Sequence, residues 1–95
     1  MDSLQTTAVK ALQGMLALQP TSPAKVAFAW RIAAGPALGR ATEPVWSEDG
    51  TLRVRAATAD WRRETTRARP VIAARLLQLL GPDVVRKIVI ESGGR

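Results

Sequence analysis

The chain has 95 residues, 46% of them hydrophobic, which is enough for one globular domain with a single core and too apolar for a disordered segment. It has no cysteine and no histidine, which excludes a disulfide framework, thiolate chemistry, and the commonest general base and metal ligand. The net charge of +6, mostly from arginine, indicates either the composition of a GC-rich genome or a surface that binds a polyanion.

The first stretch, about residues 4–18, predicts an amphipathic helix that begins after Ser3 as its N-cap. Its apolar residues recur at spacings of three and four, which places them on one face. Gly14 costs this helix about 0.8–1 kcal/mol relative to alanine, so we expect it to depend on packing against the rest of the chain.

A second helix is predicted from Ser22-Pro23, because serine caps helices and proline fits a first helical position. Its apolar face is broad, so we expect it to lie largely in the core. Pro36 should kink or end this helix, and Gly39 is the expected stop.

Residues 41–47 predict the first strand, and Asp49-Gly50 predicts the tight turn after it, since such turns require a positive φ. Pro44 cannot donate a ladder hydrogen bond, so this strand should lie at an edge or carry a bulge. Residues 51–58 predict the second strand, with apolar positions alternating with Arg53 and Arg55. One face of that strand should be buried, and the other should present positive charge.

A long third helix is predicted over residues 61–80, with Asp60 as its cap and Gly81-Pro82 as its stop. Pro70 lies inside it and removes one backbone hydrogen bond, which predicts a kink or a helix in two parts. Residues 85–91 predict a third strand, connected to the second by this helix.

The expected fold class is α+β, in the order helix, helix, strand, strand, helix, strand. The first two strands pair as a hairpin, and the third can lie parallel to one of them through a right-handed crossover. We therefore expect a three-stranded sheet with the helices packed on one face. Residues 1–91 should form a single domain, and residues 92–95 a disordered tail.

The sequence shows no catalytic constellation and no glycine-rich phosphate loop. Its carboxylates suit caps, turns and solvated faces; Glu48 and Asp49, for example, fit the hairpin turn better than acid-base chemistry or a Mg²⁺ site. We expect no enzymatic activity, no cofactor, no metal and no small-molecule substrate. With no apolar run long enough to span a bilayer and no visible signal peptide, we expect no membrane partner and a cytoplasmic location.

The candidate nucleic-acid-binding residues are arginines on the second strand and on the first half of the third helix: Arg53, Arg55, Arg62, Arg63, Arg67 and Arg69. If the open sheet face adjoins the start of that helix, these guanidinium groups would form one patch suited to phosphates. The alternative is a solvated helix face, on which Asp60 and Glu64 offset part of the charge.

The three tryptophans have different expected roles. Trp30 and Trp61 lie on apolar stripes and should be core residues. Trp46 lies near the hairpin tip beside the arginines, where an exposed indole would stack on a base or anchor a protein partner. It could equally cover the end of the core.

Several segments, in this order and at these spacings, resemble the DciA family: WRIAAGPALGRATEP over 30–44, GTLRVR over 50–55, the helix headed by Trp61, and LLGPDVVRKIVI over 79–90. The resemblance implies a KH-like core, binding to DNA without strong sequence preference, and a role with the replicative DnaB-type helicase. Gly35 and Gly39 are four residues apart rather than three, so KH-type clamping by a GxxG loop is not expected.

We therefore expect a non-enzymatic module that binds single-stranded or duplex DNA and the replicative DnaB-type helicase, and assists helicase loading. An apolar patch around the hairpin or the first helix would then contact protein. The alternative is a protein-protein adaptor that does not bind nucleic acid, whose positive charge is only compositional.

Overall fold

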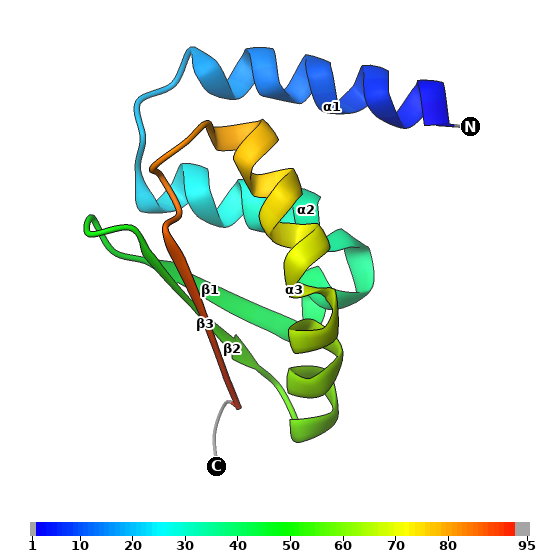
Figure 1. The fold of residues 1–95 in the computed structure, drawn as a ribbon, viewed down its shortest axis with the longest axis vertical. Helices are drawn as coiled ribbons and strands as arrows, with labels where there is room; N and C mark the ends of the chain where they lie inside the picture. The colour runs from blue at the N-terminus through cyan, green and yellow to red at the C-terminus, as the bar shows by residue number, and fades with distance from the viewer. Residues whose placement is uncertain (1, 93–95) are drawn as a thin grey trace.

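A computed structural model describes residues 2–92 of the chain, and their side chains from residue 10 onward. Three helices and three strands follow one another in the order α1 (Asp2–Ala17), α2 (Pro23–Ala41), β1 (Thr42–Trp46), β2 (Thr51–Ala56), α3 (Ala59–Leu80) and β3 (Lys87–Ser92) (Figure 1). The expected α+β class and element order are confirmed.

The sheet has the order β1-β2-β3, so β2 is its central strand. β2 pairs antiparallel with β1 and parallel with β3. Its residues Leu52, Val54 and Ala56 are fully buried beneath the helices, whereas Arg53 and Arg55 are exposed on the opposite face. The alternation read from the sequence is therefore confirmed, and the helices cover one face of the sheet only (Figure 1).

Pro44 lies in β1, which is an edge strand as expected. The backbone amides of Ala57 and Ser47 donate to the carbonyls of Ala41 and Thr51, each at 2.9 Å. Since hydrogen-bonded positions alternate along an antiparallel pair, these two bonds place the nitrogen of Pro44 on the free edge of β1. A proline there costs the sheet no hydrogen bond.

The second helix begins as predicted, because the Ser22 side chain accepts a hydrogen bond from the Lys25 amide at 3.1 Å. It is interrupted at Gly35, whose φ of 88° is accessible to glycine and strained for other residues. The helix then resumes at Pro36 and continues past Gly39 to Ala41, so the predicted kink is present but the predicted stop is wrong.

Two other predicted caps are also wrong. α1 begins at Asp2, so Ser3 lies inside the helix. α3 begins at Ala59, where the extended residue Thr58 is the N-cap and its side chain accepts from the Trp61 amide at 3.1 Å. Asp60 lies in the first turn instead, where a carboxylate still interacts favourably with the helix dipole.

Pro70 does not divide α3, which continues without a non-helical residue from Ala59 to Leu80. Pro70 and Thr66, whose carbonyl loses its donor, are both exposed, so water can take the place of the missing hydrogen bond. At the other end of the chain, β3 starts two residues later than predicted and includes Ser92, which we expected in the tail. The remainder of that tail, residues 93–95, lies outside the described residues.

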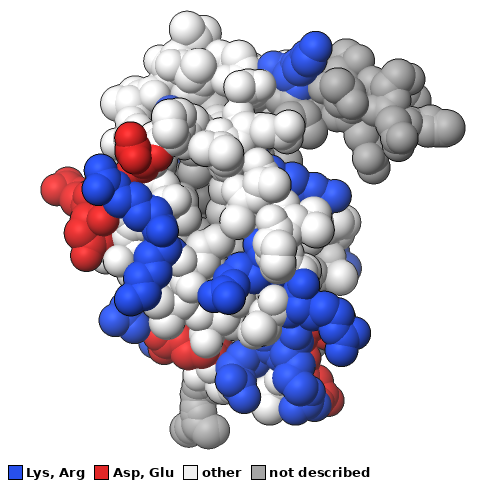
Figure 2. All heavy atoms as spheres, in the orientation of Figure 1, with Lys and Arg blue, Asp and Glu red and all other residues white. Residues whose placement is uncertain are grey.

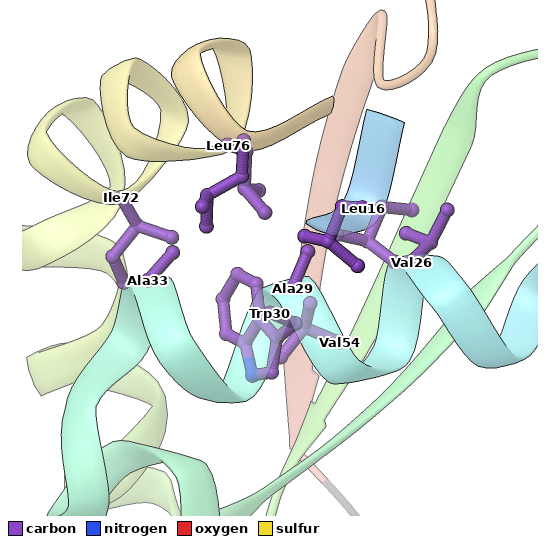
Figure 3. Close-up of a cluster of buried hydrophobic side chains, with 10 residues drawn as sticks. Leu16, Val26, Ala29, Trp30, Ala33, Val54, Ile72 and Leu76 are labelled. Atoms are coloured by element: carbon purple, nitrogen blue, oxygen red, sulfur yellow. The ribbon is translucent and has the colours of Figure 1, made fainter. Parts of the chain in front are cut away.

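The core lies between the sheet and the helices, around the fully buried Trp30 (Figure 3). Side chains from all three helices and from β2 surround it, among them Leu16, Val26, Val54, Ile72 and Leu76. The indole N–H of Trp30 donates to Thr42 Oγ1 at 2.9 Å, and that hydroxyl donates to the Leu38 carbonyl at 2.5 Å. Trp30 is thus a core residue as predicted, whereas Trp61, expected to be equally buried, is only partly covered at the start of α3.

Candidate nucleic-acid interface

The arginines of α3 point away from the core, because the opposite stripe of the helix is buried. Thr65, Ile72, Leu76 and Leu79 form that stripe and are each at most 3% exposed. Exposed positions on the other sides of the helix carry Arg62, Arg63, Arg67 and Arg69. Amphipathicity at the helical period therefore fixes the orientation of these four side chains.

Two of these arginines are paired with carboxylates on their own helix. Arg63 forms an ion pair with Asp60, and Arg67 Nη1 lies 3.5 Å from Glu64 Oε2. Such solvent-exposed pairs contribute about 0–1 kcal/mol to stability. They still lower the positive potential that this side of α3 presents to a polyanion.

The other two, Arg62 and Arg69, are seven residues apart and so lie on the same side of α3, the side that faces β3. Arg69 Nη1 reaches to 3.5 Å from the carbonyl oxygen of Ile88. Within residues 10–92, neither arginine forms an ion pair. Their charge is therefore available to a ligand between α3 and β3.

The outer face of the sheet has a different charge balance. Arg53 Nη1 donates to Glu91 Oε2 on β3 at 2.9 Å. Arg55 lies in register with Glu43 on β1 and with Glu91 on β3. A shallow hollow of about 170 Å³ on this face is lined by both arginines, both glutamates and Val45. Positive and negative groups therefore alternate across the sheet, and the expected basic face is largely compensated.

The six predicted arginines do not form one surface. Arg53 and Arg55 project from the open face of the sheet, whereas the four predicted arginines on α3 belong to the layer that covers the other face. The sheet itself separates the two groups. The sequence left open whether these regions adjoin, and the structure shows that they do not form a continuous guanidinium patch.

The structure instead shows a groove between α3 and β3 with a volume of about 410 Å³, here called the α3–β3 groove. Its lining combines three basic residues with an apolar floor and contains no carboxylate: Arg69, Pro70, Ala73, Leu76, Leu77, Gly81, Val85, Arg86, Lys87 and Ile88. Figure 2 shows basic side chains on both sides of a largely uncharged strip on this face of the molecule. The groove therefore offers separate sites for negative charge and for flat apolar groups.

The hairpin turn positions the basic residues of the β3 wall. The carbonyl of Gly50 accepts from the amides of Arg86 and Lys87, at 2.8 and 3.2 Å. Gly50 has a φ of 95°, and a Cβ there would lie 2.7 Å from Arg86 Cγ. The turn thus holds the start of β3 in place, and only glycine allows Arg86 to pass so close.

Arg86 and Lys87 were not among the predicted site residues. Their signal in the sequence is the Arg-Lys pair directly before the apolar run of the last strand. A strand after a helical crossover has its start beside the end of that helix, so a basic pair at this position lies close to the helix end. The sequence alone does not show that β3 is an edge strand with α3 beside it, so the site at this basic pair could be recognised only from the structure.

Trp46 lies at the end of the core rather than on the open sheet face. Its indole N–H donates to the carbonyl of Val84 at 2.8 Å, and its ring packs against the buried cluster. Inner-face positions alternate along β1, so Trp46 shares its side of the strand with Thr42 and Pro44. The ring is partly buried, and its remaining exposed part borders the hairpin.

The carboxylates show no arrangement typical of a metal site. Within the described part of the chain, no three of the metal-ligating acidic, histidine or cysteine side chains gather closely enough to hold an ion. Asp49 has a turn role: its Oδ1 accepts from the Thr51 amide at 2.9 Å. Hydrogen bonds from Thr51 lower the pKa of Asp49 below its ordinary value, with a smaller contribution from the charge of Lys87. None of the helices in residues 2–92 combines the length and apolarity needed to cross a bilayer.

Comparison with known proteins agrees with the resemblance seen in the sequence. Residues 3–90 match the family described as Dna[CI] antecedent, DciA. A search of curated proteins gives no match. Because the family match covers nearly all of the 95 residues, the chain belongs to the DciA family, which implies a role in loading the replicative helicase.

Proposed function

We propose that this protein binds DNA through the α3–β3 groove while it assists loading of the DnaB-type replicative helicase, and that it performs no chemistry itself. One observation carries the DNA-binding part: the groove has basic residues on both walls, an apolar floor and no carboxylate in its lining. A polyanion gains affinity from such a site, and it meets no like charge there. In this proposal the protein acts in the cytoplasm, where replication takes place.

In this proposal, Arg69 on one wall and Arg86 on the other contact phosphates, and Lys87 at the start of β3 adds positive charge beside them. Arginine is suited to this role because its planar guanidinium donates two parallel hydrogen bonds. Between the walls, Ala73 and Leu77 offer apolar surface to the faces of bases. Such contacts tolerate any base sequence, so we expect affinity without strong sequence preference.

The other predicted arginines have graded roles in the same proposal. Arg62 extends the line of Arg69 along α3 and lies where a strand leaving the groove would pass. Arg63 and Arg67 contribute less, because Asp60 and Glu64 offset their charge. Arg53 and Arg55 contribute least to binding in this groove, because they lie on the other face of the sheet, beside Glu91 and Glu43.

We still propose that Trp46 contacts a protein partner, but through only part of its ring. Its N–H is already bonded to Val84, so only the exposed part of the ring is available to a helicase. A Trp46→Phe variant keeps the apolar ring and loses the hydrogen bond, whereas Trp46→Ala loses both. If the helicase contact includes this ring, co-purification should survive the first substitution and weaken with the second.

Fluorescence anisotropy with labelled single-stranded and duplex DNA, at two salt concentrations, tests the proposed DNA binding. We expect micromolar affinity that falls steeply as salt rises, and its loss in the charge-reversed variant Arg69→Glu/Arg86→Glu. Charge reversal at Arg63, whose guanidinium is already paired, is the control. Absence of binding to either DNA at low salt would contradict the DNA-binding part and leave the family role with the helicase.

A protein adaptor that does not bind DNA is the second candidate, and a separate surface favours it. Met15, Leu18 and Phe28 are 60%, 88% and 44% exposed; exposed apolar side chains indicate an interaction surface where they lie together. Met15 and Phe28 border a hollow of about 280 Å³ between α1 and α2, whose floor includes Leu12 and Leu16. Retention of the helicase from the native host, without any DNA affinity, would favour this candidate.

A further inference from the structure

A second basic hollow lies at the opposite edge of the sheet from the α3–β3 groove. It has a volume of about 400 Å³ and lies where α2 ends against β1 and the end of β2. Three arginines line it, Arg31 and Arg40 from the two parts of α2 and Arg55 from β2, together with small residues and Glu43. Nothing in the sequence spacing of these arginines indicates that they meet, since Arg55 is on another element from Arg31 and Arg40.

The interruption of α2 creates this hollow. Gly35, with its φ of 88°, redirects the chain so that the last turns of the helix fold back on the earlier ones. A Cβ built on Gly39 would lie 3.6 Å from the carbonyl oxygen of Arg31, which shows how closely the two segments approach. The arrangement is fixed by the hydrogen bonds from the Trp30 indole to Thr42 and from Thr42 to the Leu38 carbonyl.

The charges of this hollow are not compensated by ion pairs. Within residues 10–92, none of its three arginines has a carboxylate oxygen within ion-pair distance. Glu43 is the single carboxylate of the lining and lies in register with Arg55. Arg31 and Arg40 are exposed and accessible to solvent. The hollow therefore keeps a net positive charge on a rigid backbone.

We propose that this hollow binds the phosphodiester backbone of a nucleic acid, as a contact separate from the α3–β3 groove. Guanidinium forks suit phosphates and carboxylates alike, so the rest of the lining decides between nucleic acid and an acidic protein. Apart from the three arginines and Glu43, that lining consists of glycine, alanine and threonine only. Protein interfaces depend on large buried anchors, and none is present, whereas phosphate contacts need only donors.

This inference extends the proposed function, because it rests on DNA as the ligand. β1 and β3 are the two outer strands of the sheet, so the two basic sites hold a nucleic acid at opposite edges of the domain. A strand that engages both must reach around a molecule whose longest dimension is 38 Å. At 3.4 Å per charge along one strand, that requires on the order of 11 nucleotides or more.

The experiment is an amide-resolved NMR titration of the protein with oligothymidylate of roughly 20 nucleotides, which exceeds that span. Shifts at Gly39, Arg40 and Ala57 report the hollow, and shifts at Ala73, Leu77 and Ile88 report the groove. Movement of both sets supports the inference. Movement of the groove set alone overturns the inference and leaves the proposed function intact, whereas movement of the hollow set alone overturns the groove and supports the inference. If neither set moves, both proposals fail.

Variants give an independent readout. Arg31→Gln/Arg40→Gln should reduce the magnitude of the slope of log affinity against log salt by about 1.4, since each lost contact with single-stranded DNA removes about 0.7. Lys10→Gln is a control for loss of charge, because Lys10 is exposed on α1 and lines neither site. An equal slope in the double variant and the wild type would overturn the inference. So would shifts at the hollow that only the helicase protein produces, because these would identify an acidic protein surface as the occupant.

Discussion

The α3–β3 groove and the outer face of the sheet both carry arginines but differ in how far carboxylates compensate their charge. On the sheet face, Arg53 is bonded to Glu91 at 2.9 Å, and Arg55 is flanked in register by glutamates. In the groove, Arg69, Arg86 and Lys87 line an apolar floor that contains no carboxylate. From the number of arginines alone, the two regions would be expected to bind DNA equally well.

The difference shows that a binding surface depends on the carboxylates that folding brings near the arginines as much as on the arginines themselves. Glu91 is 38 residues from Arg53 along the chain and reaches it only because β3 pairs parallel to β2. The groove, in contrast, forms where a helix lies beside an edge strand. Substitutions in the two regions should therefore have unequal effects on DNA affinity.

The largest difference in DNA affinity should come from two double variants, each of which replaces two arginines by glutamine. We expect Arg69→Gln/Arg86→Gln to weaken DNA binding by about 10- to 100-fold at low salt, because two phosphate contacts are lost from an uncompensated site. Arg53→Gln/Arg63→Gln removes the same charge from two arginines that are already paired with carboxylates, and should weaken it by less than about threefold. Anisotropy titrations of both variants under one buffer condition measure the ratio. Equal losses would mean that only net charge matters.

Gly50→Ala should damage the groove through its backbone. The substitution places a Cβ 2.7 Å from Arg86 Cγ at a residue with a φ of 95°, so we expect a loss of about 1–3 kcal/mol in unfolding free energy. It should also displace Arg86 and weaken DNA binding. Urea denaturation provides the first measurement and DNA titration the second.

Gly14→Ala is the control for that substitution, because Gly14 lies within α1 and a Cβ added there would meet no other part of the fold within 4 Å. Alanine there should instead stabilise the protein, by up to about 1 kcal/mol, through helix propensity. DNA affinity should not change. A destabilised Gly14→Ala variant, or a Gly50→Ala variant as stable as the wild type, would contradict these expectations.

Removal of the compensating carboxylates should convert the sheet face into a weak basic surface. We expect Glu43→Gln/Glu91→Gln to increase DNA affinity about two- to threefold at low salt, and the increase should disappear at high salt. The lost Arg53–Glu91 pair is exposed, so stability should change by less than about 1 kcal/mol. An unchanged affinity would place bound DNA too far from this face to sense its charge.

The smallest expected effect concerns Asp49 at the hairpin tip, next to the groove wall. Its pKa is lowered in the folded protein by hydrogen bonds from Thr51, so ionised Asp49 stabilises the fold. That contribution is complete above the unfolded pKa of about 3.9 and is lost as pH falls through the lower folded value. Asp49→Asn should therefore be less stable than the wild type at pH near 7 by a margin that shrinks below pH of about 4. Urea denaturation at both pH values measures this difference in stability. A difference that grows in acid would contradict the lowered pKa of Asp49.

Most of the fold could be predicted from the sequence, because the signals involved are local. The start of α2 at Ser22-Pro23 and the hairpin turn at Gly50 depend on residues within one turn of the chain. The alternation in β2 marks its buried face, and the missing donor of Pro44 marks an edge strand. Where two local signals competed, the prediction failed: Thr58 caps α3 instead of Asp60, and α2 continues past Gly39.

Tertiary structure alone decided the site. The candidate arginines were identifiable as basic and exposed, but their charge balance depended on contacts such as that of Arg53 with Glu91. The position of Arg86 beside the groove depended on its close approach to Gly50. Propensity and periodicity act over a few residues, whereas ion pairs and grooves depend on which elements pack side by side. The sequence therefore determined the elements, their order and the buried face of the sheet. Strand order and helix packing determined which positive charges stay uncompensated.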